Sequence, residues 1–285
     1  RFTASSDALA LAGGGGIDLK QNLLRDVRAE AVVKRPGLLD PRLSAADLRA
    51  TVSADGPLRS ARIGWTLAAA RLRLAGSGGA APLGVDGLAA AGTVVLPAGA
   101  APVAVPFALG ADRLVGLPDA VLALAARPRL SGTLMLDGKG IRIADLKAAT
   151  AAATATGRAA YSAEGRLSAT IDARVPRLVV PEVGPAAVEA RVGIGRRPGG
   201  PLMVDGRATA RALKIDNAGL GNFLGGLPVV AAAFRLRENG VIAIDDGSLT
   251  SPGLKLAGAR ATFDPATGAF TLAATGRSAA YGPVA

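Results

Sequence analysis

Short segments along the chain alternate hydrophobic and polar residues with a period of two, as at residues 71–74, 133–137 and 234–237. Successive side chains of an extended strand point to opposite faces, so this alternation predicts strands with one apolar and one solvated face. Asp-Gly and Asn-Gly dipeptides, which accept the positive φ of tight hairpin turns, lie between such segments. They occupy residues 55–56, 86–87, 137–138, 205–206, 239–240 and 246–247. The pattern predicts a mainly antiparallel sheet built from hairpins.

Two stretches of the chain share one pattern at a fixed interval. Ile143 and Ile244 lie at matching places 101 residues apart, and Gly157 and Gly258 keep the same interval. Alternating units that recur regularly are typical of elongated, repeat-like β architectures, whose function lies in an extended surface. We therefore expect Ile143 and Ile244 to lie on the same wall. The predicted organisation is one elongated fragment over 1–285, with weaker repeat units over about 1–130 and clearer units over about 131–230 and 231–285.

Helix signals are weak. The best candidate is residues 216–227, where Asp216 or Asn217 would cap a helix with Leu220 and Phe223 on its apolar side. We expect this helix to form a short plug over the end of a sheet. Residues 21–27 predict a helical turn or two at most.

Composition favours a thin structure over a thick globular core. Half of the residues are hydrophobic but only 3% are aromatic, so the apolar content is mostly Ala, Val and Leu. These side chains bury little area each, which suits a layer of many short strands. The net charge of +11 is compatible with an anionic partner such as nucleic acid or a phospholipid surface. Because the charges alternate along the chain, we prefer the interpretation that Arg fills the solvent face of strands.

The sequence contains no histidine and no cysteine. This excludes Ser/His/Asp and Cys/His catalysis and zinc sites of the ordinary Cys/His type. Asp245 and Asp246 are neighbours that would project to opposite faces of a strand, so they are interpreted as a turn signal. We therefore predict no enzymatic activity, no catalytic residues, no cofactor-binding site and no metal site.

Two weaker patterns carry no site either. The four glycines at 13–16 lack the Gly-Lys-Ser/Thr of a phosphate-binding loop and are expected to form a flexible loop. Trp65, Tyr161 and Tyr281 are too scattered to form a stacking platform for nucleic acid.

The uncharged run 87–111 is long enough to cross a bilayer, but Pro97, Pro102 and Pro106 argue against a helix there. Residues 94–96 and 103–105 are predicted instead to be edge or bent strands. The chain begins at Arg1 without an initiator Met, and we expect it to be a piece of a longer protein whose anchor would lie outside this sequence.

Segments 217–228, 241–244, 249–258 and 276–284 resemble the TamB family, the translocation and assembly module subunits, within the wider AsmA-like group of bridge proteins. The likeness is best from about Leu130 onward. It implies a periplasmic protein anchored in the inner membrane, with a sheet curled into a taco-shaped trough with an apolar interior. It also implies phospholipid transport between the inner and outer membranes, and outer-membrane protein assembly with the barrel partner TamA.

The aliphatic members of the alternating segments are the candidate lining of such a trough. They are Leu134, Leu136, Ile141, Ile143, Leu167, Ile171, Ile242, Ile244, Leu254, Leu256 and Leu272. Acyl chains could take the place of a missing second layer against these side chains. The alternative is that they pack against an opposing wall in a closed β-helix or sandwich.

Three other functions stay open. The chain could be a chaperone-like module that holds outer-membrane β-strands by β-augmentation of an exposed sheet edge. It could be a structural or adhesive β-solenoid, although a tight repeat of about 20 to 30 residues is not found. A polysaccharide-cleaving β-helix enzyme would need a carboxylate or Lys/Arg constellation that is not evident.

Overall fold

The computed structural model describes residues 1–38, 40–75, 82–97, 101–117, 119–237, 240–264, 267–279 and 282–284. Most of these residues lie in β-strands, and two short α-helices and one 3-10 turn, η1 (Pro36–Leu38), accompany them. The chain divides into two compact units, residues 1–151 and 152–285. The prediction of an all-β, mainly antiparallel protein with one or two short helices is confirmed.

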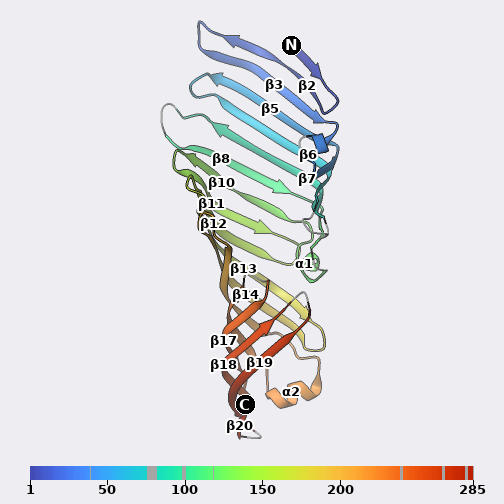
Figure 1. Ribbon diagram of the computed structural model, residues 1–285, viewed down its shortest axis with the longest axis vertical. Coiled ribbons are helices and arrows are strands. Elements are labelled where there is room, and N and C mark those ends of the chain that lie inside the picture. Colours follow the sequence, from blue (N-terminus) through green and yellow to red (C-terminus); the bar gives the residue numbers. More distant parts are fainter. Residues whose placement is uncertain are drawn as a thin grey trace. The chain divides into compact units, whose positions relative to one another are not determined.

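The first unit is an antiparallel sheet in which strands follow one another in chain order (Figure 1). Its strands are β1 (Phe2–Ser5), β2 (Leu9–Asp18), β3 (Leu23–Val33), β4 (Leu43–Ala46), β5 (Leu48–Pro57), β6 (Arg62–Leu74), β7 (Leu83–Val95), β8 (Val103–Gly110), β9 (Arg113–Val115), β10 (Arg129–Asp137) and β11 (Gly140–Ala149). Strands β4 and β5 both pair with β6, and β8 and β9 both pair with β7.

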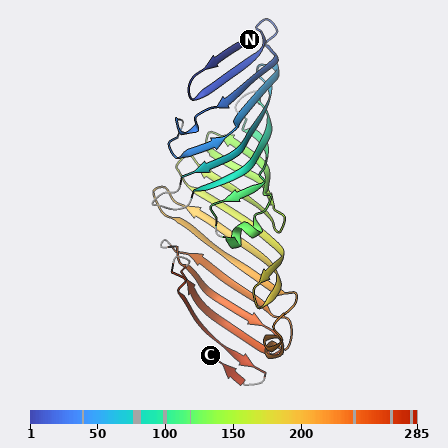
Figure 2. The same cartoon turned by 90° about the vertical axis from the view of Figure 1, so that its right-hand side faces the viewer.

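The second unit repeats this arrangement, and each strand pairs antiparallel with the next (Figure 2). Its strands are β12 (Thr154–Ser162), β13 (Leu167–Val180), β14 (Gly184–Arg196), β15 (Leu202–Ala212), β16 (Val229–Leu236), β17 (Ile242–Thr250), β18 (Leu254–Phe263), β19 (Phe270–Ser278) and β20 (Gly282–Val284). Because the connections are hairpins, each strand contacts mainly its neighbours in sequence.

Several predicted turns lie inside strands. The dipeptide at 86–87 is part of β7, 205–206 is part of β15, and 246–247 is part of β17 at a shift of register between Ile244 and Gly247. Gly87 has a φ of 63°, so its positive φ makes an irregularity within the strand and not a hairpin turn. The dipeptide at 137–138 does join two strands, β10 and β11. Asn239 lies outside the described residues.

Glycines on the sheet lie under aromatic rings of the neighbouring strand. A Cβ on Gly92 would be 2.6 Å from the indole of Trp65, and one on Gly206 would be 2.7 Å from the ring of Phe234. Gly13 is covered by Phe2 in the same way, at 2.6 Å. The expected flexible loop at 13–16 is therefore wrong, since these glycines belong to β2 and make room for a ring.

An acidic side chain ties three strands of the first unit together. Asp86 on β7 accepts hydrogen bonds from Arg73 on β6 and from Arg113 on β9, the latter at 2.8 Å from Nη2. The hydrogen bond from Arg113, followed by the one from Arg73, lowers the pKa of the Asp86 carboxyl. These ion pairs link β7 to β6 and to β9, next to the point where the partner of β7 changes from β8 to β9.

The predicted plug helix is present as α2 (Ala218–Leu224). Asn217 caps it, because its side-chain oxygen accepts a hydrogen bond from the Leu220 backbone N at 2.9 Å, and Gly225 ends it with a φ of 64°. Leu224 is only 3% exposed, and its carbonyl oxygen accepts a bond from Gly253 N at 2.6 Å. The helix therefore packs on the turn between β17 and β18.

The other helices were not predicted correctly. Residues 21–27 are not helical, because Asp18 closes a turn by accepting bonds from Lys20 N and Gln21 N and β3 begins at Leu23. Helix α1 (Asp119–Leu124) has no clear cap or periodicity in the sequence. Its position is held by Thr150, whose hydroxyl donates to the Leu124 carbonyl oxygen at 2.6 Å.

The substitution Gly206→Ala is expected to destabilise the second unit by about 1–3 kcal/mol, because the new Cβ would overpack the site. That Cβ would meet the Arg191 carbonyl oxygen at 2.5 Å as well as the Phe234 ring. Urea unfolding followed by circular dichroism measures the change. Gly195→Ala on the neighbouring strand is the matched control, since its Cβ would meet nothing within 4 Å. Equal effects of the two substitutions would contradict the packing argument.

The substitution Asp86→Asn is expected to lower stability at neutral pH. Because the folded pKa of Asp86 is depressed, its stabilisation is present above the unfolded pKa of about 3.9 and is lost as the pH falls through the folded value. The difference in urea midpoint between wild type and variant should therefore shrink as the pH is lowered from 5 toward 2. Asp7→Asn, at a position that forms none of the ion pairs found among the described residues, should show no such convergence.

Candidate functional site

The second unit carries its bulky hydrophobic side chains on one face of the sheet, here called its apolar face. The register of eight strands places one continuous row of residues side by side across this face. The row consists of Gly157, Ile171, Val192, Gly206, Phe234, Ile244, Ala261 and Leu272. A parallel row runs from Ile194 through Val204, Leu236 and Ile242 to Phe263 and Phe270. The apolar face is thus continuous across all the long strands of this unit.

The first unit has an apolar face of the same kind. One row joins Phe2, Gly13, Ala29, Val52, Trp65, Gly92, Phe107 and Gly132. The adjoining row contains Leu11, Leu67, Leu109 and Leu130. Each aromatic residue in the first of these rows, Phe2, Trp65 and Phe107, lies beside a glycine of a neighbouring strand, and the rings fill the spaces that these glycines leave.

Neither apolar face is covered by a second layer of side chains among the described residues. No large side chain there falls below 2% exposure, and six of the eleven buried hydrophobic residues are alanines. Phe270 and Leu272 are each 61% exposed, although they end the two rows of the second unit. In the second unit the apolar face is therefore open at Phe270 and Leu272, whereas in the first unit part of the apolar face is buried around Leu48, Ala69 and Leu88 and its exposed members include Phe2 and Val52.

The structure places the predicted lining residues on these faces. Leu134 lies opposite Ile143, and Leu136 lies opposite Ile141, all on the apolar face of the first unit. In the second unit the same face holds Leu167, Ile171, Ile242, Ile244, Leu254, Leu256 and Leu272. Leu254 differs from the rest, because it is only 8% exposed and lies at the end of the sheet near α2. Since Ile143 and Ile244 belong to different units, each is placed only within its own sheet.

The prediction from sequence missed the larger members of the same faces. Val192, Phe234 and Phe263 lie in the rows of the second unit, and Trp65 and Phe107 lie in a row of the first. The alternation at 188–194, where Val, Ala, Val and Ile occupy every second position, was a usable signal for β14. Nothing local in the sequence indicates that Trp65 would lie over Gly92, because that contact depends on strand register.

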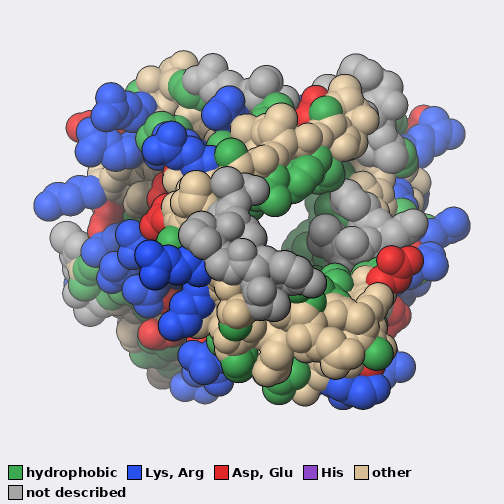
Figure 3. All heavy atoms as spheres, turned by 90° about the horizontal axis from the view of Figure 1, so that it is seen from below, with side chains coloured by type: hydrophobic (Ala, Val, Ile, Leu, Met, Phe, Trp, Pro, Cys, Tyr) green, Lys and Arg blue, Asp and Glu red, His purple; other side chains and the backbone are tan. Residues whose placement is uncertain are grey.

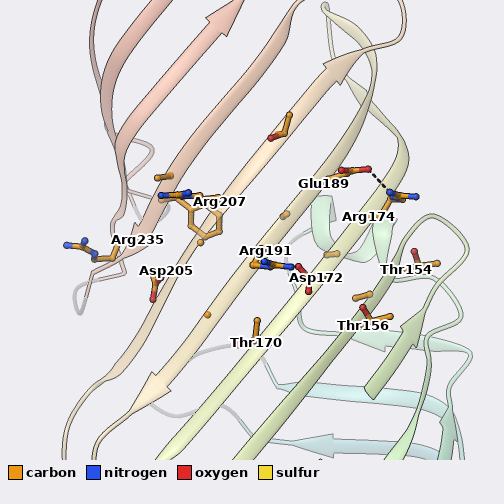
Figure 4. A pocket seen from close by; sticks show the side chains of 18 of the residues that line it. Thr154, Thr156, Thr170, Asp172, Arg174, Glu189, Arg191, Asp205, Arg207 and Arg235 are labelled. Carbon is orange, nitrogen blue, oxygen red and sulfur yellow. Dashed lines mark hydrogen bonds and ion pairs between the residues drawn. The ribbon is translucent and has the colours of Figure 1, made fainter. Parts of the chain in front are cut away.

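The opposite face of the second unit is charged and forms an open groove, here called the charged groove (Figure 4). Its volume is about 1040 Å³, and its charged lining residues are Asp172, Arg174, Glu189, Arg191, Asp205, Arg207, Arg235 and Asp245. Arg174 pairs with Glu189 at 2.7 Å, and Arg191 donates to Asp172 at 2.6 Å. The hydrogen bond to Asp172 raises the pKa of the Arg191 guanidinium. Cations and anions balance over the groove, so it offers no net charge to a partner.

In the view of Figure 3, Arg and Lys side chains project from the left and right margins, with hydrophobic side chains between them. Arg was expected to fill the solvent face of strands. In the second unit the side chains on the face opposite the apolar face include Arg174, Arg191, Arg207 and Arg235. One face of this sheet is therefore charged and suited to contact with water, whereas the other face is hydrophobic.

No group of three or more acidic, histidine or cysteine residues suitable for a metal ion occurs in the part of the chain that the structure describes. Within the same residues, no helix combines the length and apolar character that crossing a bilayer requires.

Arg207 is expected to weaken the second unit, because it lies directly opposite Arg191 in the strand register. The substitution Arg207→Glu should replace this repulsion with attraction and raise the thermal midpoint by about 1–3 °C. Differential scanning calorimetry at low salt measures the change, and added salt should diminish it. Arg211→Glu on the same strand is the control, because Arg211 lies opposite Ala187 and Val229. A gain for Arg211→Glu as large as that for Arg207→Glu would refute this explanation.

No protein-family model, no curated protein and no solved structure matches this chain. The resemblance to the TamB family therefore remains a prediction from the quoted segments. The structural features that bear on function are the two sheets and the hydrophobic rows that cross them.

Proposed function

We propose that this chain is a non-enzymatic part of a periplasmic bridge that carries phospholipid acyl chains between the inner and outer membranes. The acyl chains lie on the apolar faces, which form the floor of a hydrophobic trough. The observation that supports the proposal is the run of hydrophobic rows across each sheet, with Phe270 and Leu272 more than half exposed.

An acyl chain would cover the hydrophobic side chains of these faces and remove them from water. An extended apolar surface in water is costly and prone to aggregation unless a partner covers it. Each methylene group that leaves water contributes roughly 0.8 kcal/mol, so contact along a row of side chains adds up over one acyl chain. The charged face of the second unit keeps the outer side of the sheet in water while the apolar face holds lipid.

The location and partners in this proposal rest on the family resemblance. They are the periplasm, an inner-membrane anchor outside this sequence, contact with the outer membrane through further segments, and the barrel partner TamA. A contribution to outer-membrane protein assembly belongs to the same set of proposals.

The width of the apolar floor favours lipid transport over β-augmentation. β-augmentation uses the backbone groups of a sheet edge and does not need rows of hydrophobic side chains that cross eight strands of the second unit. An adhesive β-solenoid would stack short coils, whereas strands of up to 14 residues here form hairpins.

The substitution Leu272→Gln is expected to reduce the phospholipid that co-purifies with the protein, because it puts a polar amide on the apolar face. Native mass spectrometry and lipid extraction after expression in a bacterium with two membranes measure the bound lipid, and we expect a loss of at least about twofold. Ala273→Gln is the matched control, since Ala273 is the next residue of β19 and lies on the opposite face.

Photoreactive residues at Leu136 and Ile244 should crosslink to lipid, because both lie on apolar faces. A photoreactive residue at Ala273 should not. The absence of lipid from wild-type protein, together with no crosslinks at Leu136 or Ile244, would refute the proposed function.

A further inference from the structure

The alternation of polar and apolar residues stops in the middle of the first unit. Residues 67–70 of β6 read Leu-Ala-Ala-Ala, residues 88–92 of β7 read Leu-Ala-Ala-Ala-Gly, and residues 107–110 of β8 read Phe-Ala-Leu-Gly. Strands with apolar residues on both faces are normally covered on both faces. The face of this sheet opposite its apolar face nevertheless leaves Ala68, Ala91 and other alanines exposed.

Strand register gathers these small residues into a groove, here called the alanine groove. Its floor contains Ala68, Ala89, Ala91, Ala108, Gly110 and Ala149, all within the first unit. The groove has a volume of about 650 Å³, which lies in the range of small-molecule sites. It crosses β6, β7, β8, β10 and β11, and the part from β6 to β10 spans about 14 Å at the usual strand spacing. A single alkyl chain of about twelve carbons fits this length.

Two cations lie at the β10–β11 end of the alanine groove. Arg129 lies opposite Ala149 and Ser131 lies opposite Lys147, so Arg129 and Lys147 are diagonal neighbours on the same face of two adjacent strands. Neither forms one of the ion pairs found among the described residues, and no acidic side chain lines the groove. Two neighbouring like charges repel, and an anionic group between them would relieve this repulsion.

We propose that the alanine groove binds an anionic amphiphile with one alkyl chain. The chain lies over the alanines, and its anionic head lies between Arg129 and Lys147. Small side chains make the floor low enough for the alkyl chain, and the two cations select a charged head over a neutral one. This site is on the opposite face of the sheet from the proposed phospholipid floor, so it stands independently of that function.

The test uses dodecyl phosphate below its micelle concentration as the probe, with the whole chain and isothermal titration calorimetry. Dodecanol and inorganic phosphate separate the contributions of the chain and the head. We expect dodecyl phosphate to bind on the order of tenfold more tightly than dodecanol, and inorganic phosphate to show no measurable binding. Equal affinities for dodecyl phosphate and dodecanol would overturn the proposal, as would binding of inorganic phosphate alone.

The double substitution Arg129→Gln with Lys147→Gln should weaken dodecyl phosphate binding on the order of tenfold and leave dodecanol binding unchanged. Both positions are exposed, so the sheet should keep its circular dichroism spectrum. Arg158→Gln with Arg166→Gln, a pair in the second unit, is the control for net charge. An equal loss with the control pair would show nonspecific attraction to a basic protein and overturn the site.

Ala91→Met should fill the groove and weaken the binding of both dodecyl phosphate and dodecanol, because its longer side chain occupies the space of the alkyl chain. Leu272→Gln, on the apolar face of the second unit, should leave dodecyl phosphate binding at the groove unchanged. Unchanged binding by Ala91→Met would overturn the proposal. A change of oligomeric state in sedimentation by Ala91→Met would also overturn it, because the groove would then be an interface between copies of the chain.

Discussion

The backbone hydrogen-bond ladder is the interaction on which both units depend. Among the described residues no large side chain is fully buried, and the buried cluster of the first unit is built around Leu48, Ala69 and Leu88. Burial of side chains therefore contributes less to the stability of each unit than it does in a domain with two packed layers. Pairing along strands of up to 14 residues fixes which side chains share a face, and both candidate surfaces follow from that pairing.

Small residues serve opposite purposes on the two faces. On the apolar faces, Gly92 and Gly206 let an aromatic ring from the next strand lie close to the backbone, which fills the surface. On the other face of the first unit, alanines in β6, β7 and β8 have no large neighbour over them and leave a hollow. Small residues thus allow close packing of aromatic rings on the apolar faces, and they leave a groove on the other face of the first unit.

Alternation in the sequence was sufficient to predict an all-β, mainly antiparallel protein and the direction of several side chains, but not the extent of each strand. It placed Leu134, Ile143, Ile171 and Ile244 correctly relative to their neighbours, because side-chain direction in a strand follows from counting residues. It could not predict that Asp86-Gly87 makes an irregularity inside β7, since turns and bulges use the same residues. The alanine groove depends on contacts between β6, β7, β8 and β10, and only register reveals those contacts.

The hairpin order of the strands has a consequence for how such a protein can vary. Each strand from β13 to β19 pairs with the strands that come directly before and after it in the chain, within the second unit. Removing or adding one hairpin would change the reach of the sheet and leave distant contacts untouched. Each hairpin gained or lost during evolution would therefore change the width of this sheet by about two strand spacings, roughly 10 Å.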